Sequence, residues 1–351
     1  MKAAHEFQSP EIRLERVACP RCRSLRSSLV YTAHDYIYGL PGTFYAESCD
    51  DCGFWFQNPR PVESDIPLLY PGNYGPHAES TPRLMKIPKR ANWLRKGWRG
   101  WNSGYLTRQL AYKHRTSAHV SNRLGAALGS AISRVARWRA GCDLLPRFVP
   151  EGRLLELGCG NGETLNRLHD LGWRNLYGVE MSDSAARIAR RSGFTVMTTT
   201  IETALETYPD GWFDAIVAEM VLEHLVNPFE VVKQIARKLK PGGEFLFSTV
   251  IRDSLDGRVF GRYGVCYDFP RHMVFFRKRD LNELLRPDFD RIQSWHQNTP
   301  IDFQRPAYLR SARFDPEIQR FFKSRAGARV VYGLARLKLM GRVSYRCRRK
   351  S

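Results

Sequence analysis

Two short cysteine pairs stand out near the start of the chain. Cys19 and Cys22 form one CxxC pair, Cys49 and Cys52 form the other, and 26 residues separate them. A tight turn with two thiolates is half of a tetrahedral zinc site, so two such turns supply all four ligands. Redox pairs of the thioredoxin type are the alternative, but no βαβ pattern precedes these cysteines. Because four sulfurs leave no position for a substrate, we expect a structural zinc ion.

A glycine-rich turn lies near the middle of the chain. Residues 153–157 predict a buried strand, and residues 163–170 predict the helix that follows it. The turn between them contains Gly158, Cys159, Gly160 and Gly162. Glycines let the backbone turn sharply and approach a ligand closely, and a helix N-terminus favours a carboxylate or phosphate. The spacing is GxGxG, because Glu163 stands where the dinucleotide fingerprint has its third glycine.

A carboxylate follows the next predicted strand. Residues 176–179 form that strand, and Glu180 comes 18 residues after Gly162. A carboxylate in this place suits two ribose hydroxyls and repels a 2′-phosphate. The alternative is a solvated acid at a strand end.

These groups belong to an alternating pattern of strands and helices. The predicted strands are residues 153–157, 176–179, 213–217 and 244–249, and the predicted helices are 163–170, 184–192 and 228–239. This alternation predicts an α/β fold with a doubly wound, mostly parallel sheet, which binds ligands beyond the carboxyl ends of its strands.

Five segments in order resemble class I S-adenosylmethionine (SAM)-dependent methyltransferases. They are Leu154-Leu-Glu-Leu-Gly-Cys-Gly-Asn-Gly162, Tyr177-Gly-Val-Glu-Met-Ser182, Phe213-Asp-Ala-Ile-Val217, Val221-Leu-Glu-His-Leu225 and Leu239-Lys-Pro-Gly-Gly243. The resemblance covers about residues 151–250 and extends less tightly to about 290. It implies a seven-stranded Rossmann-like sheet, SAM as cofactor and methyl transfer as the activity.

The resemblance also implies individual cofactor contacts. Glu156, Gly158, Cys159, Gly160 and Gly162 would surround the methionine portion, Glu180 would hold the ribose, Met181, Thr200 and Ile201 would flank the adenine, and Glu219 with Met220 would border the methionine end and the acceptor cavity. The family often has Asp where this chain has Thr200, whose hydroxyl would make a weaker contact.

The front of the chain narrows the resemblance. The two cysteine pairs, Asn58-Pro-Arg-Pro61 and the stretch Leu69–Tyr74 are similar to bacterial methyltransferases with an N-terminal zinc ribbon. That group implies a sugar, a cell-surface polysaccharide or a lipid-linked precursor as acceptor. The alternatives are ubiquinone-type O-methylation of a small molecule, methylation of RNA or protein, and a non-catalytic SAM-binding scaffold. Oxygen, nitrogen and carbon acceptors all stay open.

Two histidines are candidates for the catalytic base. His224 follows the strand at 213–217, and His272 follows the strand at 244–249. Methyl transfer is an in-line displacement, so the protein supplies position and a base. The alternative for His224 is packing or capping beneath the cofactor. Arg271 is a candidate for binding a phosphate or carboxylate of the substrate.

The charge is concentrated in two blocks. The chain has 55 Lys and Arg against 35 Asp and Glu, a net charge of +20. Residues 83–150 carry +14 and residues 305–351 carry +12, whereas residues 1–82 and 151–304 carry −3 each. Both basic blocks show helical apolar spacing. Packed helices with solvated basic faces, an anionic membrane surface and nucleic acid are the three interpretations.

These observations predict five segments. They are a zinc ribbon at 1–62, a linker at 63–89, a basic helical segment at 90–150, the methyltransferase domain at 151–304 and a basic C-terminal helical extension at 305–351. No stretch approaches the about 20 apolar residues of a membrane span, and the first 16 residues do not look like a secretory signal. We expect a cytoplasmic protein in a reducing compartment, with attachment to the inner membrane face as a further expectation.

Overall fold

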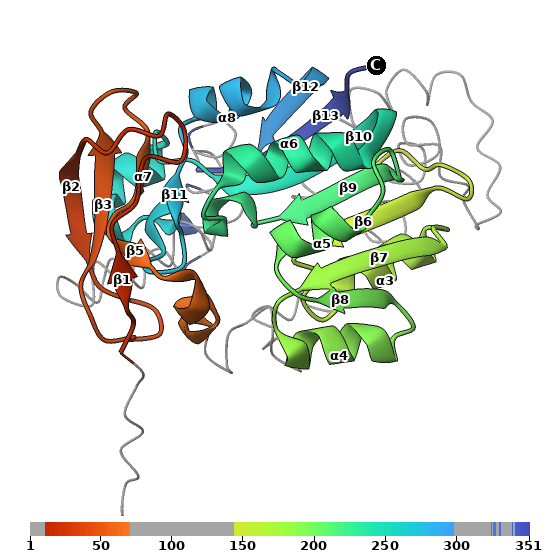
Figure 1. Ribbon diagram of the computed structural model, residues 1–351, viewed down its shortest axis with the longest axis horizontal. Helices are drawn as coiled ribbons and strands as arrows, with labels where there is room; N and C mark the ends of the chain where they lie inside the picture. Colours follow the sequence, from red (N-terminus) through yellow and green to blue (C-terminus); the bar gives the residue numbers. More distant parts are fainter. Residues whose placement is uncertain are drawn as a thin grey trace, which may run out of the picture.

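The main body is a seven-stranded sheet with the strand order β12-β13-β10-β9-β6-β7-β8. The computed structural model describes residues 11–70, 144–297 and 341–351, together with residues 324, 326, 327, 330 and 339. The strands are β6 (Arg153–Leu157), β7 (Asn175–Glu180), β8 (Thr195–Thr198), β9 (Phe213–Glu219), β10 (Leu239–Val250), β12 (Phe289–His296) and β13 (Arg342–Arg349). Only β13 among them runs antiparallel to its neighbours. The predicted mostly parallel sheet is confirmed (Figure 1).

Helices cover both faces of this sheet. One face carries α5 (Ile201–Thr207), α6 (Pro228–Lys238) and α8 (Lys278–Leu285), and the other carries α3 (Glu163–Asp170) and α4 (Asp183–Arg191). Successive strand residues alternate between the faces, so Leu155 packs with the first set and Leu154 with the second. The fold is therefore doubly wound, as predicted.

The last strand overturns part of the predicted C-terminal extension. We expected residues 305–351 to form a basic helical extension, but Arg342–Arg349 is strand β13, inserted between β10 and β12. Val343, Tyr345 and Cys347 are fully buried on one face, and Tyr345 stacks on Phe247 with ring centroids 5.0 Å apart. The arginines between them hid this period-2 pattern, and the partner strands are distant in sequence. The domain predicted to end at residue 304 therefore includes this strand.

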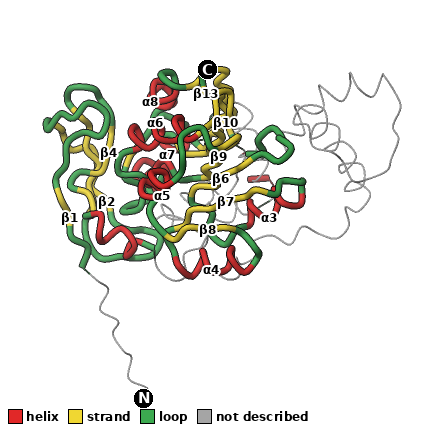
Figure 2. Tube along the Cα trace, turned by 45° about the vertical axis from the view of Figure 1, so that its right-hand side comes forward, coloured by secondary structure: helices red, strands yellow, loops and turns green. Residues whose placement is uncertain are grey.

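The N-terminal residues form a small β module beside the main sheet. Strands β2 (Ser27–Ala33), β3 (Phe44–Cys49) and β4 (Trp55–Gln57) pair antiparallel, and β1 (Leu14–Glu15) pairs with β5 (Arg60–Pro61). The sheet gains a fourth strand, β11 (Val274–Phe275), from the segment after β10. That segment also contains α7 (Leu255–Phe260), η5 (Gly261–Tyr263) and η6 (Val265–Tyr267). Figures 1 and 2 show the module against this part of the chain.

Two further predicted boundaries differ from the structure. The predicted linker at 63–89 begins with a 3-10 helix, η1 (Glu63–Leu69), in which Leu69 is fully buried and Asp65 accepts hydrogen bonds from Arg13. The predicted basic helical segment at 90–150 lies mostly outside the described residues, and its described part, 144–150, contains no helix. Leu144 and Leu145 instead pack on the face with α3 and α4.

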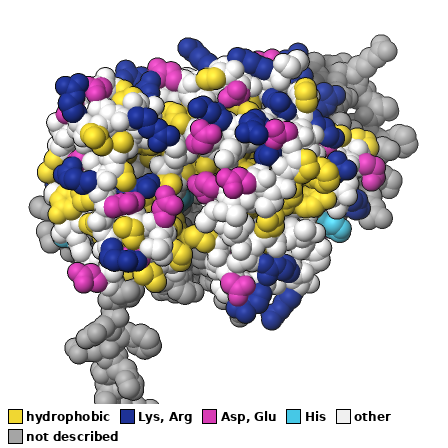
Figure 3. Space-filling view, in the orientation of Figure 1, with side chains coloured by type: hydrophobic (Ala, Val, Ile, Leu, Met, Phe, Trp, Pro, Cys, Tyr) yellow, Lys and Arg dark blue, Asp and Glu magenta, His cyan; other side chains and the backbone are white. Residues whose placement is uncertain are grey.

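The described surface carries no dominant sign of charge in the view of Figure 3, where acidic and basic side chains alternate. This agrees with the small net charge of residues 1–82 and 151–304. Within the described ranges, no helix is both long and apolar enough to cross a bilayer.

Candidate functional site

The glycine-rich loop after β6 is held against the neighbouring strand. The N–H groups of Gly158 and Cys159 both donate to the Val179 carbonyl, at 2.8 and 3.0 Å. Gly158 and Gly162 have φ angles of +69° and +83°, in the left-handed region that favours glycine. A Cβ on Gly158 would also lie 2.9 Å from Val221 Cγ2. The loop therefore requires glycine, and it begins helix α3 with Gly162 as the N-cap.

Glu180 connects this loop to the next helix. Its Oε2 accepts a hydrogen bond from Gly160 N at 2.9 Å, and its Oε1 accepts one from Ser182 N at 2.7 Å. The side chain lies at the carboxyl end of β7 and is buried.

Two more carboxylates lie close to Glu180. Glu156 is in β6, and Glu219 ends β9. Burial raises the pKa of Glu156 well above its usual range, and the nearby charges of Glu219 and Glu180 raise this pKa further. Glu156 Oε2 has no hydrogen-bond partner among the described residues. This arrangement suits a ligand that brings positive charge.

Met220 has an uncommon backbone conformation beside these carboxylates. It follows Glu219 with φ +54°, which is uncommon for a residue other than glycine, and its N–H donates to Ser248 O at 2.9 Å. Such backbone conformations cluster at ligand sites, where the surrounding structure holds them in place.

The other predicted cofactor residues lie around the same edge of the sheet. Met181 directly follows β7, and Ile201 begins α5. Thr200 is the N-cap of α5, and its Oγ1 accepts a hydrogen bond from Thr203 N at 3.3 Å. Cys159 is buried, and burial raises the pKa of its thiol, so it packs as an unreactive side chain. The adenine contacts of Met181, Thr200 and Ile201 stay predictions.

The two predicted histidines lie together beyond β9 and β10. His224 ends η4 (Leu222–His224), and the rings of His224 and His272 are 4.7 Å apart between centroids. His224 Nδ1 is 3.1 Å from Arg271 O, and His272 Nδ1 is 3.0 Å from Cys266 O. Burial lowers the pKa of His224 to about 3, and the neighbouring His272 contributes, so the His224 ring is neutral at pH 7.

Glu223 completes this group. Its side chain is fully buried, and its Oε2 accepts a hydrogen bond from Thr249 Oγ1 at 2.7 Å. Burial raises the pKa of Glu223 above its usual value. One ligand atom from each of Glu223, His224 and His272 can be chosen so that all three lie within 4.8 Å of one another.

The N-terminal module holds the segment that carries His272. Gln57 Nε2 donates to the carbonyls of Pro270 and His272, both at 3.0 Å. Arg271 makes a two-pronged ion pair with Asp35 at 2.8 and 2.9 Å, and both side chains are fully buried. Its guanidinium also donates to Asp268. Arg271 is thus committed to the protein itself, contrary to the expectation that it binds substrate.

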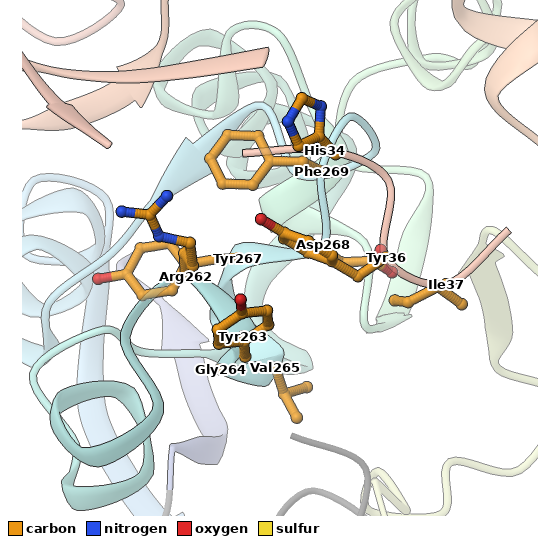
Figure 4. A pocket seen from close by; sticks show the side chains of 10 residues that line it. All are labelled: His34, Tyr36, Ile37, Arg262, Tyr263, Gly264, Val265, Tyr267, Asp268 and Phe269. Atoms are coloured by element: carbon orange, nitrogen blue, oxygen red, sulfur yellow. The ribbon is translucent and has the colours of Figure 1, made fainter. Parts of the chain in front are cut away.

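A pocket lies where the module meets the segment after β10. Figure 4 shows residues of the 34–37 loop facing residues 262–269. Aromatic rings from Tyr36, Tyr263 and Tyr267 line it, together with Arg262 and Asp268. A second cavity, of about 280 Å³, lies between the module and the turn at Val226 and Asn227. Both are shared between the module and the main domain.

The four cysteines of the module come together as predicted. Cys19 Sγ is 3.6 Å from Cys52 Sγ, and Cys22 Sγ is 3.5 Å from Cys49 Sγ, with all four as free thiols. The two turns have the same backbone pattern, because Arg23 N donates to Cys19 O and Gly53 N donates to Cys49 O, each at 2.9 Å. Arg23 and Gly53 also share a left-handed conformation. The arrangement suits a tetrahedral metal ion.

A family of known proteins matches the part of the chain that forms this edge of the sheet. Residues 131–287 match the family model described as a methyltransferase domain. This match, to somewhat less than half of the chain, supports a SAM-dependent methyltransferase domain there. The match begins 20 residues before the predicted boundary at residue 151 and includes the glycine loop, the three carboxylates and both histidines.

Individual relatives are more distant. A ubiquinone biosynthesis O-methyltransferase of Saccharophagus degradans is 27% identical over 162 residues, which are 44% of this chain and 66% of the relative. The protein of the same name from Pectobacterium carotovorum is 25% identical over 175 residues, which are 48% of this chain and 69% of the relative. A solved SAM-dependent methyltransferase from Archaeoglobus fulgidus is 19% identical, with a TM-score of 0.40, and the match covers 64% of this chain and 93% of that one.

The matched region has a site whose residues fit SAM. The buried Glu156 oxygen without a partner and the two nearby carboxylates, of Glu180 and Glu219, suit the sulfonium and ammonium charges of that cofactor. Gly158, Gly160 and Gly162 remove the side chain from three of the five loop positions. Glu180 has the place expected for a ribose ligand, since ligands in this class of fold bind beyond the carboxyl ends of the strands.

The structure also contains functional candidates that the sequence analysis missed. They are Gln57 and Asp35 in the module, Glu223 beside His224, and Tyr70, whose hydroxyl is 3.1 Å from His224 Nδ1. Glu223 adjoins a predicted histidine, so its chemistry was a usable signal. Gln57, Asp35 and Tyr70 are distant from their partners in sequence, and no local pattern marks them.

Proposed function

We propose that the protein transfers a methyl group from SAM to a hydroxyl of a ring-shaped small-molecule acceptor. The supporting observation is that one edge of the sheet carries both the acidic glycine cradle and the Glu223, His224 and His272 group. Relatives named ubiquinone biosynthesis O-methyltransferase support an oxygen acceptor. Bound SAM supplies an electrophilic methyl carbon on sulfur.

Transfer of the methyl group to the acceptor oxygen would leave S-adenosylhomocysteine as the second product, and the acceptor hydroxyl would give up its proton. The glycine loop and Glu180 position the cofactor, so their contribution is orientation. The group at His224 and His272 lies beyond β9 and β10, where a histidine would accept the proton of the acceptor hydroxyl.

Within this function, we favour a sugar or a lipid-linked or polysaccharide precursor as acceptor. The pocket of Tyr36, Tyr263 and Tyr267 offers ring faces, and Asp268 and Arg262 offer hydrogen-bonding groups beside them. A sugar presents apolar C–H faces and polar edges, which this combination suits. A phenolic ring of the ubiquinone type is the second candidate, supported by the names of the relatives. The test is to incubate the protein with SAM and each acceptor and to measure S-adenosylhomocysteine (SAH). Formation of SAH with sugar nucleotides but not with catechols supports the sugar, and the reverse result supports the phenol.

We also propose that Cys19, Cys22, Cys49 and Cys52 hold a structural zinc ion. Zinc–sulfur bonds of about 2.3 Å in a tetrahedron place the sulfurs about 3.8 Å apart, close to the two measured contacts of 3.5 and 3.6 Å. A site of four thiolates has no open position, so its role is to fold the module that holds Gln57 and Asp35.

The cofactor proposal is tested by calorimetric titration of the full chain with SAM and with S-adenosylhomocysteine (SAH). Glu180→Ala should weaken both about 10- to 150-fold, because charge-assisted hydrogen bonds contribute about 1.5–3 kcal/mol. Glu206→Ala, which removes an exposed carboxylate of α5, is the control and should bind like the wild type. A folded wild-type protein that binds neither compound would overturn the proposed function.

A further inference from the structure

The group formed by Glu223, His224 and His272 contains two imidazoles that the main chain orients in the same way. Each histidine has its Nδ1 next to a main-chain carbonyl, Arg271 O for His224 and Cys266 O for His272. A carbonyl can only accept a hydrogen bond, so the proton of neutral His272 belongs on Nδ1 and its Nε2 has a free lone pair. His224 Nδ1 faces both the Arg271 carbonyl and the Tyr70 hydroxyl, and donation to the carbonyl gives this ring the same tautomer, with the hydroxyl as a second acceptor. Metal-binding histidines are oriented in this way by a second hydrogen bond.

Glu223 provides an independent observation. The side chain has no exposed surface, and only Oε2 is engaged, by Thr249. Oε1 has no hydrogen-bond partner among the described residues. A buried polar atom without a partner costs about 1–3 kcal/mol, so in native structures a water molecule, an ion or another ligand usually engages it.

We propose that Glu223, His224 and His272 bind a divalent transition-metal ion at a site separate from the four cysteines. Two imidazoles and one carboxylate are a ligand set for zinc that leaves a fourth position open. Metal–ligand bonds of about 2.0–2.2 Å require ligand atoms about 3.3–3.6 Å apart, so the side chains would close from their limit of 4.8 Å. The cysteine site would hold its metal with four thiolates and no open position, whereas this site would leave one position open for a further ligand.

The position of the metal gives it a use, and this step rests on the proposed function. The three residues lie beyond the carboxyl ends of β9 and β10, on the acceptor side of the sheet. A metal ion with an open position can take an acceptor oxygen as ligand and lower the pKa of its hydroxyl. The histidines would then act through the metal and not as the base themselves.

The test is the zinc content of the full-length chain. Protein stripped by a chelator, reloaded with Zn²⁺ under reducing conditions and desalted should hold two zinc ions per chain by mass spectrometry. Glu223→Gln and His272→Gln should each hold one, and the Cys22→Ser/Cys52→Ser double variant should also hold one. His169→Gln, which removes an exposed histidine of α3, is the matched control and should hold two.

Wild-type protein that takes up a single zinc ion, lost completely in the double cysteine variant, would overturn the proposal without any variant of the new site. Co²⁺ gives a second measurement if the Glu223 and His272 variants do not fold. In the double cysteine variant, cobalt should show d–d absorption without thiolate charge transfer. A folded double cysteine variant that binds no cobalt would also overturn the site. SAM affinity is measured separately, so a failure of metal binding is distinct from a failure of the proposed function.

Discussion

Two parts of the proposed site share one edge of the sheet but are assembled differently. We call the glycine loop with Glu156 and Glu180 the cofactor end, and the group of Glu223, His224 and His272 the acceptor end. The cofactor end comes mainly from one continuous stretch, β6, the glycine loop, α3 and β7, in which Glu180 contacts Gly160 20 residues away. The acceptor end joins residues separated by up to 236 positions, as in the Asp35–Arg271 pair. A local loop can hold a common cofactor, whereas the proposed acceptor end is built in contact with the N-terminal module.

This difference gives the module a positioning role. It adds a strand pairing to β11, two hydrogen bonds from Gln57 and one buried ion pair to the segment 268–275 that carries His272. Disturbing the module should therefore affect the acceptor end and leave the cofactor end intact.

The largest effect is expected from Asp35→Asn. Removing one partner of a buried ion pair costs about 3–5 kcal/mol in the free energy of unfolding when the other charge is left unpaired. Asp268 still pairs with Arg271, so we expect a loss near the lower end of this range. Asp183→Asn is the control, because its pair with Arg187 is exposed and such pairs contribute about 0–1 kcal/mol. Urea unfolding measures both. Equal effects of the two variants would contradict a dependence of the acceptor end on this ion pair.

Gln57→Leu should lower the free energy of unfolding less than Asp35→Asn does, and it should also affect the acceptor end and not the cofactor end. The change leaves the Pro270 and His272 carbonyls without their donor, which costs about 1–3 kcal/mol. We expect methyl transfer to slow while SAM affinity stays that of the wild type. Gln293→Leu, on the exposed side of β12, is the control. A loss of SAM affinity in Gln57→Leu, measured by calorimetry, would show that the two ends are not separable.

The smallest effect is an opposite response of the two regions to acid. Hydrogen bonds from Arg13 lower the pKa of Asp65 in the module to about 2, so this stabilisation is present above the unfolded pKa of about 3.9 and is lost as the pH falls from about 4 to about 2. The raised pKa of Glu156 has the other sign, because the cost of its burial as an anion disappears as the pH falls.

Urea unfolding without SAM, from pH 7 to pH 2.5, measures this contrast. The stability difference between the wild type and Asp65→Asn should shrink in acid below about pH 4. The wild type should gain stability relative to Glu156→Gln as the pH falls from the raised pKa toward the unfolded value of about 4.3. Parallel pH profiles for the two variants would contradict the assigned signs.

Local chemistry made the cofactor end predictable. The strand at Arg153–Leu157 and the helix at Glu163–Asp170 have the predicted bounds, because apolar runs, glycines and helix caps act over a few residues. The cysteine pairs were also recognisable, since each CxxC turn contributes two ligands by itself. Strand β13 was not predictable, because the arginines in Arg342–Arg349 obscured its alternation and its partner strands are far away in sequence.

The sequence by itself determined the strand–glycine–helix unit, the acid at Glu180 and the four-cysteine set, because each depends on residue type and short spacing. Only the tertiary structure decided that the N-terminal module shares a sheet with β11, that Arg271 is buried against Asp35, and that Glu223 and the two histidines meet. The physical reason is that these contacts are made between elements whose mutual placement follows from burial of their common core, and no local propensity specifies it.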